Sequence, residues 1–241
     1  MNQGTALRRL VGVFGIAIVG LGACGGGSSS DVVIRVAGKP ISKATVDHWL
    51  KVEAVISNEL IPRRPPPKGL VPDPPAYTDC IAYQRTHGLA LPKGSAAQVT
   101  AALKGQCRKR YESVRQHVLQ LLVTFQWLIG EGARHGVKVS AGEVRQALAR
   151  FRRENFTSDA AFEHYFTYTG ETPADQSLVL KIDLLVAKLQ HRITAQGGAA
   201  ALAKFSKELT SRWVARTSCR RGYVVPDCKQ YNGPLPPEAA T

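Results

Sequence analysis

The sequence predicts a mainly α-helical fold with short strands near its two ends. From residue 111 onward, apolar residues recur at steps of three and four, the spacing that places them on one face of a helix. Residue types that cap helices separate these stretches, and glycines interrupt them. The two strand-like runs, at 32–36 and 223–225, are short by comparison.

The first expected elements are a strand and a helix. Residues 32–36 are β-branched and apolar at alternate positions, and residues 37–40 are typical of a tight turn. Ser42 can cap a helix that begins at Lys43. A proline-rich surface loop is then expected over 62–107, because clustered prolines cannot continue a helix.

The longest helix is expected next, followed by a second helix that turns back on it. The first of these begins at Tyr111, and Gly136 fits its end. Ser140 and Glu143 have the spacing of a capping box, which opens the next helix. These residues predict a helical hairpin.

Three more helices are expected in the C-terminal half. Ser158 precedes a short aromatic helix, and Thr-Pro at 172–173 starts another. The glycine pair at 197–198 breaks the pattern before a last helix over 202–213. A strand-like segment at 223–225 follows.

The N-terminus has the three parts of a secretion signal. Arg8 and Arg9 precede an apolar run, and the small-residue tetrapeptide LGAC follows at 21–24. The tetrapeptide is typical of a lipobox, in which the cysteine sulfur receives a diacylglycerol. The apolar run is short for a membrane span, which needs about 20 residues. We therefore expect a cleaved signal peptide over 1–23 and lipid attachment at Cys24.

The chain is strongly basic, with a formal net charge of +14. Arg8 and Arg9 contribute two of these charges, so the mature chain keeps +12. An exported protein rarely meets nucleic acid, and nucleic acid is not an expected partner. Anionic lipid, anionic envelope polymers and acidic peptides are the expected neighbours.

Four cysteines remain once Cys24 is assigned to the lipid. An even number in an exported chain indicates two disulfides, with three possible connectivities. We favour Cys80 with Cys107 and Cys219 with Cys228, because each pair closes a local segment rich in turn residues. Neither pair has the two-to-four-residue spacing of a zinc site.

Motifs for other chemistry are missing from the sequence. The six histidines are scattered, and none has an HExxH or Ser/His/Asp context. The stretch 130–136 lacks the lysine and the preceding strand of a phosphate loop and is interpreted as a helix end. No cofactor, metal site or catalytic residue is expected.

Aromatic residues gather around the second and third expected helices. Most are expected to lie in the core. An exposed face rimmed by Arg150, Arg152 and Arg153 would suit an unfolded peptide, whose exposed side chains are apolar and often neighboured by acids. The candidate peptide-binding residues are Phe151, Phe156, Phe162, Tyr165 and Phe166.

Three segments resemble the SurA N-terminal, or trigger-factor/SurA-type, chaperone domain shared with PrsA-like foldase lipoproteins. They are VIRVAGKPISKATVDHWL, ESVRQHVLQLLVTFQWLIGEGARHGVKVSAGEVRQAL and FTSDAAFEHYFTYTGETPADQSLVLKIDLLVAKLQ. Together they cover most of residues 32–193. The resemblance implies a domain in which the first strand pairs with the last segment, here 32–36 with 223–225.

The resemblance also implies a function and a domain organisation. It implies an ATP-independent chaperone that binds unfolded or nascent exported polypeptides at the extracytoplasmic face of the cell membrane. The expected parts are a signal peptide over 1–23, a flexible tether over 24–31, a single helical domain over 32–228 and a disordered tail over 229–241.

Many members of that family insert a parvulin-type prolyl isomerase domain of about 90 residues after the helix that corresponds to 173–193. Only residues 194–241 remain here, and part of them is already assigned to a helix. We therefore expect no enzyme activity. Two alternatives stay open: a prolyl isomerase that works without the inserted domain, and a non-catalytic lipoprotein that binds the envelope.

Overall fold

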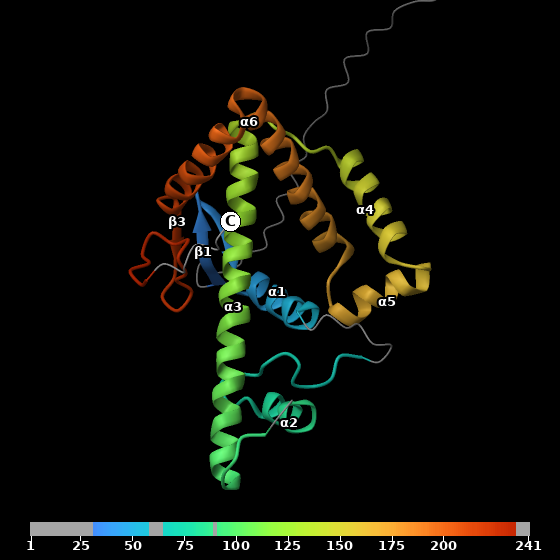
Figure 1. The fold of residues 1–241 in the computed structure, drawn as a ribbon, viewed down its shortest axis with the longest axis vertical. Coiled ribbons are helices and arrows are strands. Elements are labelled where there is room, and N and C mark those ends of the chain that lie inside the picture. Colours follow the sequence, from blue (N-terminus) through green and yellow to red (C-terminus); the bar gives the residue numbers. More distant parts are fainter. Residues whose placement is uncertain (1–30, 58–64, 89–90, 235–241) are drawn as a thin grey trace, which may run out of the picture.

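The computed structural model describes residues 31–57, 65–88 and 91–234, and this part of the chain is mainly helical (Figure 1). The expected fold class, helices with a small β pairing, is confirmed. The expected signal peptide and lipid-carrying Cys24 lie outside the described residues. The elements are β1 (Val32–Val36), β2 (Lys39–Ser42), α1 (Lys43–Ile56), α2 (Thr78–His87), α3 (Ala96–Arg134), α4 (Ala141–Asn155), α5 (Asp159–Thr169), α6 (Pro173–Val214) and β3 (Thr217–Cys219).

The three strands form one antiparallel sheet in the order β2-β1-β3. The central strand pairs Ile34 with Ile41 on one side and with Cys219 on the other. The sheet thus joins the two ends of the domain, as expected, but the C-terminal partner is β3 and not residues 223–225. Residue 225 looked strand-like because it is apolar, but Val225 is buried in the turn that follows β3.

The main core lies between the sheet, α1, α3 and the end of α6. Helix α3 supplies more of the buried core residues than any other helix. Its Trp127 donates from Nε1 to Thr217 Oγ1 at 2.8 Å. Buried members include Val33, Ile34, Val36, Ile41, Val46, Trp49, Val52, Val118, Leu119, Leu122, Val123, Trp127 and Trp213.

The loop expected over 62–107 is corrected by the structure, because it contains α2 and the first turns of α3. Asp73 caps α2 from outside the helix: its carboxylate accepts from the backbone N–H groups of Asp79 and Cys80, both at 3.1 Å. Ser95 opens α3 with a capping box, so this helix begins well before Tyr111. The apolar stripe is weak here because the start of α3 packs mainly against α2 and Tyr77 before it.

Both expected disulfides are present. Cys80–Cys107 joins α2 to α3, and Cys219–Cys228 closes the turn after β3. The tail expected to be disordered from residue 229 is corrected for residues 229–234, because Lys229 N–H donates to Thr217 O at 2.9 Å and ties the chain to β3. Residues 235–241 lie outside the described part.

The upper end of α3 is packed on two sides by α6 (Figure 1). The break expected in α6 is confirmed: Gly197 and Gly198 have non-helical backbone angles, and Gly198 has a φ of 63°. Within α3, Gly130 faces Trp213 from the second half of α6, and Gly132 faces Leu185 from the first half. These glycines lie inside the helix and allow close packing, whereas the sequence suggested only a helix end.

Glu131, between these two glycines, is fully buried. Its Oε1 accepts from Trp213 Nε1 at 2.8 Å and from Arg212 Nη1, and its Oε2 accepts from Arg134 Nε at 3.2 Å. His135 Nε2 lies 3.4 Å from Oε2. Burial alone would raise the pKa of Glu131, but the hydrogen bonds from Trp213 and Arg212 and the nearby arginine charges lower the pKa below its usual value.

The glycine contacts predict opposite effects of one substitution at two positions of α3. A Cβ at Gly130 would lie 2.0 Å from the Trp213 ring, so Gly130→Ala should lower the free energy of unfolding by about 1–3 kcal/mol. Gly105 has no atom within 4 Å of such a Cβ, so Gly105→Ala should raise it by up to about 1 kcal/mol. Urea unfolding of both variants measures the difference, and an equal effect at the two sites would contradict the packing role.

A second prediction concerns the buried carboxylate. Glu131→Gln removes the charge that compensates the Arg212 guanidinium, and we expect it to lower the free energy of unfolding by about 3 kcal/mol. Glu208 also lies near Arg212, at 3.5 Å, but is half exposed, so Glu208→Gln should cost less than about 1 kcal/mol. Chemical denaturation of the two variants tests this, and similar losses would show that Glu131 has no special role.

Candidate functional site

Helices α4 and α5 and the first half of α6 form an arm beside the main core (Figure 1). Within it, α4 packs along α6, and α5 contacts α1. Local sequence explains this path. Ser140 caps α4 together with Glu143, Ser158 caps α5, and Gly170 ends α5 with a φ of 72°, in the left-handed region that favours glycine. The arm is therefore built from short, well-capped helices.

The five candidate aromatic residues meet at the corner between α4 and α5. They contact one another edge to face, with ring centroids 5.4 Å apart for Phe151 and Phe156 and 4.9 Å apart for Phe162 and Phe166. The Tyr165 ring lies 5.4 Å from that of Phe156. All five are half-buried and none belongs to the buried core. The corner thus keeps aromatic surface in contact with solvent.

The arginines expected at the rim have different positions. Arg152 forms an ion pair with Asp159, and its guanidinium lies 5.4 Å from the Phe162 ring centroid. Arg150 lines a groove next to the corner, and Arg153 is exposed. Of the three arginines, Arg152 lies against the aromatic corner and Arg150 lies beside it.

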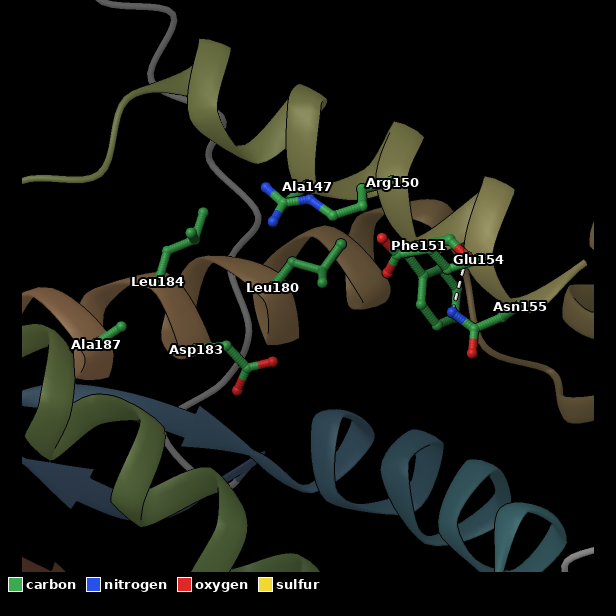
Figure 2. Close-up of a pocket in the computed structure, with 9 residues that line it drawn as sticks. All are labelled: Ala147, Arg150, Phe151, Glu154, Asn155, Leu180, Asp183, Leu184 and Ala187. Carbon is green, nitrogen blue, oxygen red and sulfur yellow. Dashed lines mark hydrogen bonds between the residues drawn. The ribbon is translucent and has the colours of Figure 1, made fainter.

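A groove of about 280 Å³ runs between α4 and α6 and reaches the aromatic corner (Figure 2). Ala147 and Phe151 line it from α4, and an apolar row lines it from α6. Its polar lining residues are Arg150, Glu154, Asn155 and Asp183, and the row from α6 is Leu180, Leu184 and Ala187. An apolar surface with charged groups of both signs along it can accept the side chains of an extended peptide.

The sequence contained a signal for this groove that the helix pattern hid. Ile182, Leu185 and Leu189 of α6 recur at helical spacing and are buried on the core side. Leu180 and Leu184 lie on a different face of the same helix, four residues apart. A helix that is apolar on two faces packs on two sides, and α4 lies over the second face of α6. The cover is partial, and this leaves the groove.

Polar contacts join α5 to the segment before α6, and α6 to α1. Tyr165 Oη donates to Glu171 Oε2 at 2.6 Å, and His48 Nε2 lies 2.9 Å from Asp175 Oδ2. Glu171 is buried, and burial raises its pKa. The same burial, with the Glu171 contact, raises the pKa of Tyr165. Tyr165 therefore has a structural hydrogen bond as well as a place in the aromatic corner.

Metal binding and membrane crossing are two further possibilities for the described ranges. No group of three His, Cys, Asp or Glu side chains there is arranged to hold a metal ion. No helix in residues 31–57, 65–88 or 91–234 has the length and apolar character needed to cross a membrane.

The buried carboxylate of the arm predicts a pH-dependent effect. Because the pKa of Glu171 is raised on folding, its contribution to stability is complete below the unfolded pKa of about 4.3 and is lost as the pH rises through the folded pKa. Glu171→Gln keeps an acceptor for Tyr165 and removes this loss. The variant should melt at a higher temperature than the wild type at pH 8, and the gap should shrink at pH 4. A gap that is equal at both pH values would contradict the raised pKa.

Comparisons of the chain with protein-family models, with curated proteins and with solved structures find no match.

Proposed function

We propose that this protein is a membrane-tethered, ATP-independent chaperone that binds unfolded segments of exported polypeptides on the arm. The observation that carries the proposal is the aromatic corner of α4 and α5, which continues into the groove between α4 and α6. Aromatic rings provide large contact areas with few rotatable bonds, and such surfaces suit partners of varied sequence. The resemblance of residues 32–193 to the SurA N-terminal chaperone domain favours the same function.

The size of the groove supports transient binding. About 280 Å³ lies at the lower end of the volumes of ligand pockets, so the groove accepts a few side chains of an extended segment. The small contact area favours fast release, which a chaperone without nucleotide hydrolysis needs. The arm is also charge-balanced, with seven arginines and lysines and seven acidic residues over 141–193. Apolar contact would therefore dominate client selection.

The proposed location follows from the leader sequence. Lipid attached at Cys24 would hold the domain at the extracytoplasmic face of the cell membrane, and residues 24–31 would be the tether. Exported polypeptides leave the translocation machinery at that face. The tether would therefore raise the concentration of the chaperone where unfolded segments appear.

The test places a charge in the groove without altering the core. Ala187 is exposed on the groove side of α6, so Ala187→Glu should weaken suppression of client aggregation about tenfold by putting a carboxylate among apolar contacts. Ala203 is exposed in the second half of α6, away from the groove, and Ala203→Glu is the matched control. Light scattering of a reduced, unfolded client measures both.

Three outcomes would overturn the proposal. The first is wild-type protein that fails to suppress aggregation even in excess over the client. The second is equal activity of the two alanine variants. The third is acceleration of proline-limited refolding at substoichiometric amounts, which would favour the prolyl isomerase alternative.

A further inference from the structure

Positive charge is concentrated around the sheet. The β1–β2 hairpin, residues 32–42, and the C-terminal segment 215–234 together contain six cations and one acid. The arm has equal numbers of both signs, whereas these two segments have a clear excess of cations. The cations are Arg35, Lys39, Arg216, Arg220, Arg221 and Lys229, and the acid is Asp227.

Backbone pairing places these side chains along the central strand. Arg35 is exposed in the middle of β1, opposite Pro40 and Ser218. At one end of β1, Ala37 N–H donates to Arg216 O at 2.8 Å, and at the other end Arg220 N–H donates to Val33 O at 2.8 Å. We call Arg35, Lys39, Arg216 and Arg221 the basic sheet face.

Intramolecular acids do not neutralise this face. Arg35, Lys39 and Arg221 form no ion pair with any other residue of the described part of the chain. Arg216 lies over an aromatic ring, with its guanidinium 5.8 Å from the centroid of Trp213. The acids nearest in sequence are Asp31, directly before β1, and Asp227, whose pKa is raised by burial. The basic sheet face is therefore available to an external anion.

The face also contains a hollow. A depression of about 220 Å³ is lined by Arg35, Ser218, Arg220 and Gln230, and by the strand residues Val32, Val33, Ile34 and Cys219. Polar and apolar surface contribute about equally to its lining, whereas the groove on the arm is mainly apolar. A phosphate group placed here would meet guanidinium, hydroxyl and amide groups, which are the usual partners of a phosphate.

The chain outside the described residues ends close to this face. β1 begins at Val32, so seven residues separate it from Cys24. Fully extended, the chain from Cys24 to Val32 spans at most about 29 Å. With lipid on Cys24, the basic sheet face could never lie far from the bilayer surface.

We propose that the basic sheet face binds the headgroups of anionic phospholipids. This inference rests on the proposed lipid anchor for its biological setting, but the contact itself involves only residues of the folded domain. Lipid at Cys24 supplies the first attachment, and the arginines supply the second. Each basic residue near an anionic membrane strengthens binding roughly fivefold, so several together have a measurable effect.

The test uses the chain from Gly25 to Thr241 without lipid, which retains all described elements and both disulfides. The chain should sediment with phosphatidylcholine vesicles that contain phosphatidylglycerol and not with pure phosphatidylcholine vesicles. Arg35→Gln, Arg216→Gln and Arg221→Gln combined should lower the partition coefficient on the order of 100-fold. The folded state of each variant is checked by its melting temperature.

The matched control removes the same charge elsewhere. Arg145, Lys181 and Arg192 are exposed on the arm, and their combined replacement by Gln should lower partitioning less than about threefold. If the first triple variant unfolds, Lys39→Gln with Arg221→Gln tests the same face through two exposed side chains.

Equal losses in the sheet variant and the arm control would overturn the proposal, because net charge alone would then explain binding. Binding to neutral vesicles as strong as to anionic ones would do the same, and so would binding to a purified anionic envelope polymer but not to vesicles. Aggregation suppression is measured in parallel. A sheet variant that loses lipid binding and still protects clients would separate this surface from the arm.

Discussion

The buried carboxylate of Glu131 determines how the chain can close. A carboxylate removed from water costs several kcal/mol unless charged and hydrogen-bonding groups surround it. Two of these groups come from Arg212 and Trp213, some 80 residues further along the chain. The second half of α6 must therefore return to the C-terminal end of α3. The glycines beside Glu131 remove the side chains that would otherwise keep α6 away.

The return of α6 to α3 separates the main core, which closes the fold, from the arm. The kink at 197–198 reverses the direction of α6 and delivers β3 to the edge of β1, so both ends of the domain enter one core. Helices α4 and α5 of the arm supply none of the buried residues of the main core. Its aromatic residues can remain half exposed without weakening the contacts that close the fold. A binding surface on the arm therefore has a low cost in stability.

Local signals in the sequence predicted the elements that depend on local physics. The Ser140–Glu143 capping box, the glycine break and the two short-range disulfides were all identified from the sequence. The missed elements depend on distant partners. Strand β3 is polar in sequence. It forms because its backbone pairs with β1 and because Thr217 Oγ1 donates a hydrogen bond to Trp213 O. Helix α2 is capped by Asp73, which lies outside the helix. The aromatic corner was predicted, but the groove required the position of α4 on α6.

The proposed arrangement assigns the two surfaces to opposite tasks. Figure 1 shows the arm on one side of α3 and β3 with the C-terminal segment on the other. A lipid tether alone would leave the domain free to rotate, so the groove would face the bilayer part of the time. A second contact through the basic sheet face would turn the arm outward. That contact could be weak, because the proposed tether would already hold the arginines at a high effective concentration near the headgroups.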